Sequence, residues 1–313
     1  MISFTKSYFY FILCFFLLHT GADCLFAQNN TSFFQRSDTL NKNRRTAVYI
    51  TEAALGTAAL IGLNEAWYAQ YDRSGFHSLN DNSQWMQMDK FGHAFSSYYI
   101  GKMGMDALAW AGETKKNQLI YGATLGFVFL GTIEVLDGFS EEWGFSTGDI
   151  MANAFGTGLL IGQELLWDEQ RIQMKFSFQH TAYADNNPDK LGSTRLQQLL
   201  KDYNGQTYWL SANIKSFLPK KSKFPAWISV SAGYGAEGML GANSNPPSIG
   251  GEPLPEFPRY RKYFFSLDVD LPKIKTRSHF LKFIFNGLNF IKIPFPTLEY
   301  NKEEGVVFHP IYF

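Results

Sequence analysis

Six polar residues between positions 89 and 153 have the types and the spacing that chemistry requires. Asp89 and His93 are four residues apart, and so are Asp149 and Asn153, so each pair shares one face if its segment is helical. Imidazole and carboxylate groups that converge can bind a divalent metal, transfer protons, or form a buried network at helix ends. The six residues are Asp89, His93, Glu134, Asp137, Asp149 and Asn153.

We interpret this set first as a structural network, because aspartate is a frequent N-cap and one histidine without cysteine is a weak zinc-binding set. Two alternatives stay open: a divalent-metal site that uses Asp89, His93 and Glu134, and an acid–base catalytic site. Apart from such a metal we expect no cofactor, since the chain has no phosphate-binding loop, dinucleotide fingerprint or nucleophile elbow.

Apolar periodicity predicts four helices that position these residues. The short connection at 112–116 makes the second and third helices antiparallel, and a loop at 137–147 turns the chain back. The start of the second helix, the end of the third and the start of the fourth therefore meet at one end of a bundle, where the six residues can converge. The expected helices cover residues 46–71, 89–111, 117–136 and 148–171.

Two features of these helices bear on their packing. Gly122 with Gly126, and Gly158 with Gly162, are glycine pairs one turn apart, a spacing that lets neighbouring backbones approach closely. Of the uncharged runs, only 117–133 approaches the roughly 17–25 residues that a membrane span needs. We therefore favour a compact bundle, with membrane-spanning helices as the alternative.

After residue 171 the apolar residues recur with a period of two, as in Phe265 and Leu267 between Ser266 and Asp268, which predicts strands. About six strands are visible, fewer than the roughly eight of the smallest closed membrane barrel. We predict an α+β fold, in which a helical region at 45–171 precedes an antiparallel β-rich region at 172–313 that packs on it. Partial membrane insertion of the strands is the alternative. The expected strands cover residues 173–183, 208–215, 227–234, 265–271, 290–293 and 306–313, with a loop at 246–258.

The first 27 residues have the pattern of a secretory signal peptide. Lys6 precedes an uncharged, largely apolar run, and we expect cleavage after Ala27. Lipidation of Cys24 is the alternative, which Gly21 and Asp23 disfavour. Both cysteines of the chain lie in this leader, so the mature protein has no disulfide and must fold by packing alone.

Composition and charge exclude some classes of protein. Aromatic residues make up 17% of the 313 residues and charged residues only 18%, which excludes a long disordered chain. The 28 basic and 28 acidic residues cancel, so we expect no nucleic-acid partner.

Residues 28–44 are polar, and we expect a flexible lead-in. Residues 28–170 carry a net charge of −7 and residues 171–313 one of +7, which favours two structural regions that attract each other.

The polar residues also form a motif in a fixed order: Asp89-Lys90-x-x-His93, then Glu134, then Ser146-x-x-Asp149-x-x-x-Asn153-x-x-Gly156. Over roughly residues 85–170 the chain resembles the YfiM-like family of predicted periplasmic lipoproteins of unknown function. Residues 201–209 resemble longer members of that family. The order is also similar to VanZ-like membrane proteins, which are linked to glycopeptide or teicoplanin resistance. Those proteins lack a β-rich half, so the resemblance does not imply a resistance role.

We therefore expect an exported protein in the periplasm or at the periplasmic face of the outer membrane, with a membrane or another envelope component as its partner. Our first interpretation of its function is a non-enzymatic structural or interaction role. The alternative is a metal-dependent or acid–base enzyme that acts on an envelope glycan or lipid.

Overall fold

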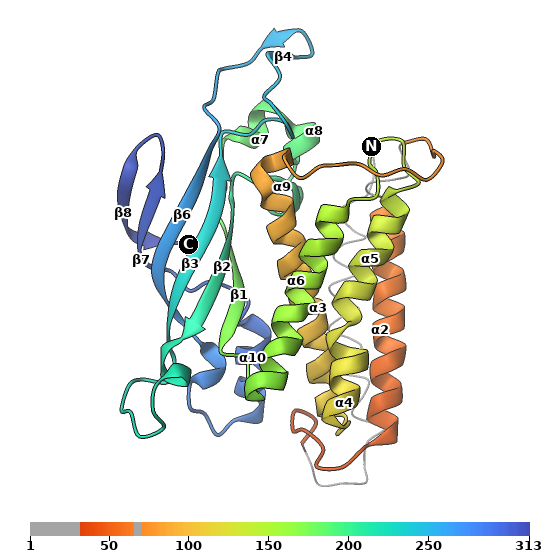
Figure 1. Cartoon of the computed structure of the whole chain (residues 1–313), viewed down its shortest axis with the longest axis vertical. Coiled ribbons are helices and arrows are strands. Elements are labelled where there is room, and N and C mark those ends of the chain that lie inside the picture. Colours follow the sequence, from red (N-terminus) through yellow and green to blue (C-terminus); the bar gives the residue numbers. More distant parts are fainter. Residues whose placement is uncertain (1–31, 66–70) are drawn as a thin grey trace.

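The computed structural model describes residues 32–65 and 71–313, and the expected signal peptide lies outside them. Helices come first along the described chain and an antiparallel sheet follows, so the predicted α+β fold is confirmed. Figure 1 shows the sheet on one side of the molecule and the long helices on the other, with α3 and α6 beside the sheet.

The long helices follow the predicted periodicity, with shifted ends. α2 begins at Lys42, earlier than expected, because the side chain of Asn41 accepts a hydrogen bond from the backbone N–H of Arg44. The third expected helix is composite, since a π-helical segment at Gln118–Ala123 separates α4 from α5. The long helical elements are α2 Lys42–Leu63, α3 Met88–Trp110, α4 Lys115–Asn117, α5 Leu125–Asp137 and α6 Thr147–Trp167.

Shorter helices lie before α3 and within the β-rich region. The 3₁₀ turns are Gln84–Gln87, Ile214–Phe217 and Leu271–Lys273, and the α-helical segments are α7 Tyr183–Asn186, α8 Pro188–Leu191, α9 Arg195–Lys201 and α10 His279–Leu288.

Glycines allow α5 and α6 to pack closely on α3. A Cβ atom on Gly126 would lie 2.0 Å from a carbonyl oxygen of α3, and one on Gly122 would lie 2.5 Å from a backbone nitrogen of α3. The expected close approach is thus confirmed for this pair. It is wrong for Gly158 and Gly162, which face open space, because Gly156 is the glycine of α6 that meets the α3 backbone.

The sheet has six antiparallel strands in the order β1-β2-β3-β6-β7-β8. The strand predicted at 290–293 is wrong, since only Ile291 forms an isolated bridge there, and the strand β7 follows at Phe295–Asn301. The expected loop at 246–258 contains the two-residue strands β4 and β5. The main strands are β1 Ile172–Phe178, β2 Gln206–Asn213, β3 Ile228–Glu237, β6 Tyr260–Val269, β7 Phe295–Asn301 and β8 Gly305–Tyr312.

Aromatic packing joins α3 to the first strands of the sheet. The ring of Phe91 stacks on that of Tyr234 with centroids 4.5 Å apart, and the ring of Phe95 lies 5.8 Å from that of Tyr208. Tyr98 of α3 is fully buried in the main apolar cluster. The helices and the sheet are therefore held together mainly by apolar contacts.

In the part of the sheet that begins at β6, the two faces have the reverse of the usual polarity. On β6, Lys262, Ser266 and Asp268 are buried together with one aromatic residue, Phe264, whereas Phe265 and Leu267 are exposed. On β7, the buried side chains are likewise polar and the exposed ones apolar. A soluble sheet normally buries its apolar face, so the β6–β8 part of this sheet presents to its surroundings the face that other sheets hide.

Two helical stretches of the described chain are long and apolar enough to cross a membrane, namely α2 and Lys115–Asp137. A core helix of a soluble protein can pass the same test of length and composition. Such a core helix is mostly buried, however, and only Arg44 and Val48 are buried in α2.

Candidate polar site at one end of the helical bundle

An unusual turn leads into α3 and fixes the direction of its first residues. Trp85, Met86 and Gln87 all have left-handed backbone conformations, with φ of 47°, 53° and 68°. Such residues cost of order 1–3 kcal/mol each, so the surroundings must hold them. The hydroxyl of Tyr234 donates to the carbonyl of Met86, and Arg261 donates to the side chain of Gln87. The sheet thus fixes the start of the site-bearing helix.

Lys90 lies at the centre of three carboxylates. Its Nζ is 2.7 Å from Oδ1 of Asp81, 2.9 Å from Oδ2 of Asp89 and 2.9 Å from Oδ1 of Asp149. Burial lowers the pKa of Lys90, but the three carboxylates outweigh burial and raise that pKa above its ordinary value. Burial also raises the pKa of Asp89. Lys90 is therefore a firmly charged partner for these acids.

His93 connects α3 to both neighbouring helices. Its Nε2 lies 3.7 Å from Oε1 of Glu134 and 3.8 Å from Oδ1 of Asp149, and its Nδ1 lies 3.2 Å from Oδ1 of Asn153. The side-chain amide oxygen of Asn153 can only accept, so in the neutral ring Nδ1 carries the proton and Nε2 presents its lone pair to the two carboxyl groups. The His93 side chain keeps 23% exposure.

Glu134 and Asp149 are held by the start of α6. The hydroxyl of Ser146 caps α6 by accepting a hydrogen bond from the N–H of Asp149, and it donates to Asp81. The N–H of Ser146 donates to Oε2 of Glu134 over 3.2 Å, while Oε1 of Glu134 has no hydrogen-bond partner. Burial, with the charges of Asp149 and Asp137, raises the pKa of Glu134 to about 8.

The structure brings the predicted residues together, although Asp137 contributes through its charge and not through a contact with His93. Asp89 faces Lys90, and His93, Glu134, Asp149 and Asn153 form a contiguous group. Asp137 lies one turn after Glu134, half-buried, and acts on the group through its charge. Sequence reasoning missed the roles of Asp81 and Lys90, although Lys90 stands in the motif beside Asp89.

The arrangement has three chemical capacities. Three carboxylates and one ammonium can hold the helix ends together as a charged network. A partly exposed imidazole beside a carboxyl group can transfer a proton. The nitrogen of His93 with one oxygen each of Glu134 and Asp149 can also hold a metal ion, because these atoms lie within 4.8 Å of one another.

Comparison with known proteins gives one match, and it covers the residues of this site. No curated protein and no solved structure matches the chain. Residues 78–161, which hold the whole polar cluster, match the model of a family described as predicted periplasmic lipoprotein (DUF2279).

Proposed function

We propose that the protein is a membrane-associated protein of the cell envelope with a structural or interaction role, and that its apolar outer surfaces contact lipid. The reversed polarity of the sheet carries this proposal. The same reversal is the rule where a sheet is surrounded by lipid, with apolar side chains outward and polar ones inward. The family match over residues 78–161 is consistent with an envelope location.

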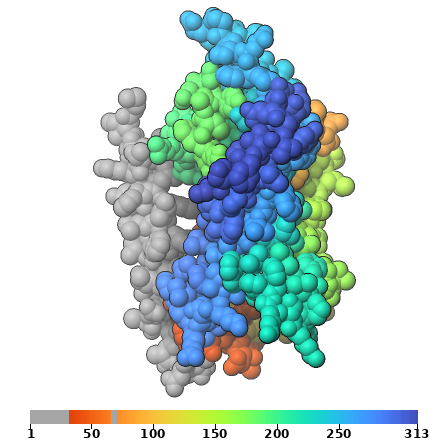
Figure 2. Space-filling model, turned by 90° about the vertical axis from the view of Figure 1, so that its left-hand side faces the viewer, coloured from red at the N-terminus to blue at the C-terminus, as the bar shows by residue number. Residues whose placement is uncertain are grey.

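The exposed apolar face of the sheet is continuous across strands. Phe265 of β6, Leu298 of β7 and Phe308 of β8 are direct neighbours in the register and are 57%, 47% and 60% exposed. The next row has the same character, with Tyr263 beside Tyr300. Figure 2 shows the β7–β8 hairpin, in dark blue, at the surface of the molecule. Contiguous apolar surface of this kind marks a contact with lipid or protein.

The helices add a second apolar surface. Leu165 and Leu166 of α6 are 70% and 74% exposed, and Val128 of α5 is exposed as well. The hydroxyls of Thr124 and Thr132 donate to carbonyls one turn earlier in their own helix, so neither needs water as an acceptor. This is how threonine is satisfied on a helix surface that faces lipid.

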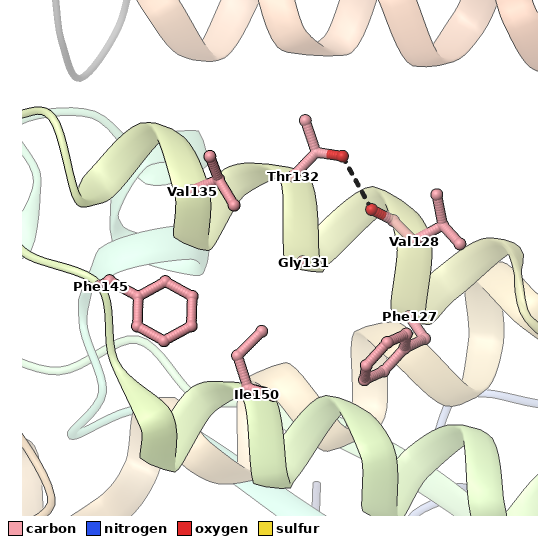
Figure 3. A pocket seen from close by; sticks show the side chains of 7 residues that line it. All are labelled: Phe127, Val128, Gly131, Thr132, Val135, Phe145 and Ile150. Atoms are coloured by element: carbon pink, nitrogen blue, oxygen red, sulfur yellow. Dashed lines mark hydrogen bonds between the residues drawn. The ribbon is translucent and has the colours of Figure 1, made fainter. Parts of the chain in front are cut away.

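A shallow apolar groove of about 400 Å³ runs between α5 and α6 on this surface. Figure 3 shows its side chains, of which only Thr132 is polar, and the hydroxyl of that residue bonds to the carbonyl of Val128. The groove therefore has no side-chain group free to hydrogen-bond a ligand, and its apolar lining suits an acyl chain better than a polar ligand. Its lining consists of Phe127, Val128, Gly131, Thr132, Val135, Phe145 and Ile150.

The amphipathic helix α10 fits the edge of a membrane. None of its residues is buried, and Phe280 and Phe283 are exposed on it. Lys275, Arg277 and Lys282 are exposed on and beside the same helix. Apolar and basic residues in this combination bind the headgroup region of anionic lipid.

Fractionation of the full chain, expressed with its leader in a host with two membranes, tests the proposal. We expect the protein in the membrane fraction after a carbonate wash and its release by detergent. The double substitution Phe265→Glu with Phe308→Glu should move it into the wash, because charges on a lipid-facing surface are costly. Ser193→Glu with Ser244→Glu adds the same charge at exposed polar positions and should have no effect. Wild-type protein that is released by carbonate alone would contradict the proposal.

A further inference from the structure

We propose that His93, Glu134 and Asp149 bind one divalent transition-metal ion at the end of the helical bundle. This inference does not depend on membrane association. It assigns Asp149, in place of Asp89, as the third ligand beside the histidine and the glutamate.

The hydrogen bond of His93 leaves Nε2 unprotonated in the neutral ring, so this nitrogen can bind a cation. Since Nδ1 donates to the side-chain amide oxygen of Asn153, the lone pair of Nε2 is left for Oε1 of Glu134 and Oδ1 of Asp149, which lie 3.7 and 3.8 Å away. A hydrogen-bond acceptor that fixes the other ring nitrogen is the usual partner of a metal-binding histidine. Three electron-pair donors thus converge, and a cation between them would satisfy all three.

An unpaired buried oxygen is the second, independent observation. Glu134 is fully buried and its Oε2 accepts the N–H of Ser146, yet its Oε1 has no hydrogen-bond partner. Leaving a buried carboxylate oxygen unsatisfied is costly, so such an atom indicates a ligand. Oε1 is also the atom of Glu134 that faces Nε2 of His93.

The charges favour a cation at this position. Three carboxylates, those of Asp81, Asp89 and Asp149, surround the ammonium of Lys90, and the carboxyl group of Glu134 lies beside His93. The ammonium of Lys90 already occupies the space between Asp81, Asp89 and Asp149, so that group of three acids has its cation. Among the described residues Glu134 pairs with no ammonium or guanidinium group. A divalent ion beside it would share Oδ1 of Asp149 with Lys90, since that oxygen lies 2.9 Å from Nζ of Lys90 and 3.8 Å from Nε2 of His93.

The donor atoms select the class of metal. One imidazole nitrogen with two carboxylate oxygens suits zinc or manganese better than calcium or magnesium, which prefer oxygen ligands alone. Zinc bonds of about 2.0–2.2 Å place tetrahedral ligand atoms roughly 3.3 Å apart. Nε2 of His93 lies 3.7 and 3.8 Å from the two oxygens, and all three atoms lie within 4.8 Å of one another, so the side chains must close around the ion on binding. Three protein ligands leave at least one position for water.

Metal titration of the full, detergent-solubilised chain tests the site. After treatment with a chelator, we expect the wild type to bind one equivalent of Zn²⁺ in calorimetry. Glu134→Gln should weaken binding by more than about tenfold, since even the outer partner of a ligand is worth that much. Glu113→Gln, which alters a buried glutamate beside Arg45 at the other end of α3, should bind as the wild type does. Equal binding by Glu134→Gln and wild type would overturn the proposal.

The spectrum of the wild type loaded with Mn²⁺ provides a readout that does not require any variant to fold. Electron spin-echo spectra of the Mn²⁺-loaded wild type should contain modulation from a directly bound imidazole nitrogen, and His93→Gln should lose it. His309→Gln, in which the altered histidine contacts Glu299 on the sheet, should keep it. A wild type that binds Mn²⁺ without nitrogen modulation, or that binds neither metal, would exclude the site.

Discussion

At the scale of single residues, the polar site depends on groups that sequence spacing can place and on groups that it cannot. The pairs Asp89 with His93 and Asp149 with Asn153 follow from helical spacing, and both take part in the cluster. Asp81 lies before the left-handed turn at residues 85–87 that leads into α3, so its contact with Lys90 does not follow from helical spacing. Non-glycine residues in that conformation have no signal in the sequence, so neither Asp81 nor the central position of Lys90 was predictable.

Lys90→Met tests whether the charged network holds the site together. Removing the ammonium leaves Asp81, Asp89 and Asp149 close together without their shared partner. Breaking a buried ion pair from one side typically costs about 3–5 kcal/mol of unfolding free energy. Denaturant unfolding should show a loss of this size. The matched variant Lys190→Met removes a pair with Glu142 that is exposed on both sides, and it should cost less than about 1 kcal/mol. Equal losses in the two variants would contradict a central role for Lys90.

Lys292 makes stability depend on pH in the alkaline range. Burial, with the charge of nearby Lys175, lowers the pKa of Lys292 to about 8 despite Asp268. Between pH 8 and the unfolded value of about 10.4, the unfolded chain binds one proton more than the folded chain, so this group makes stability rise with pH. The free energy of unfolding from pH 7.5 to 10 should therefore rise more steeply in wild type than in Lys292→Met. A variant of exposed Lys302, Lys302→Met, should keep the wild-type slope. Parallel profiles for wild type and Lys292→Met would refute this assignment.

At the scale of elements, periodicity located the long helices but could not rank their glycines. All four glycines of the two pairs have the same spacing, yet only Gly122 and Gly126 meet a neighbouring backbone. Which side of a helix faces a neighbour depends on how the helices pack, and the spacing of glycines along the sequence does not contain that information. The strand β7 was misplaced for a related reason, since Pro296 lies inside it and prolines normally end a predicted strand.

A pair of alanine substitutions distinguishes the two kinds of glycine. Gly126→Ala would place a Cβ atom 2.0 Å from the carbonyl oxygen of Ser97, so α5 must move away from α3 and the protein should lose stability. Gly158→Ala has nothing within 4 Å of the new atom and should stabilise the helix by up to about 1 kcal/mol. Thermal unfolding of both variants should shift in opposite directions. An unchanged or raised melting temperature for Gly126→Ala would show that the packing of α5 on α3 is looser than described.

At the scale of the whole molecule, the sequence predicted two regions of opposite charge, and ion pairs such as Glu169 with Lys273 do join them. That pair is about one-third exposed on each side and therefore weak, so the apolar contacts of α3 carry the interface. The alternation of Phe265 and Leu267 with Ser266 and Asp268 predicted a two-faced strand. It could not show which face is covered, because that depends on where the helices end on the sheet. α3 covers β1 and β2 and reaches β3 through Phe91, and the apolar face of β6–β8 stays open.

The most direct test of lipid contact is a spin label at position 308 of the protein in vesicles. Cys24→Ser with Phe308→Cys provides one attachment site, since the remaining cysteine lies in the expected signal peptide. Because Phe308 is exposed on the apolar face, the label should relax faster with lipid-soluble oxygen than with a water-soluble nickel complex. The same label at exposed Ser244 should show the opposite order. If the nickel complex relaxes the label at 308 as strongly as it does at 244, the apolar face of the sheet does not contact lipid.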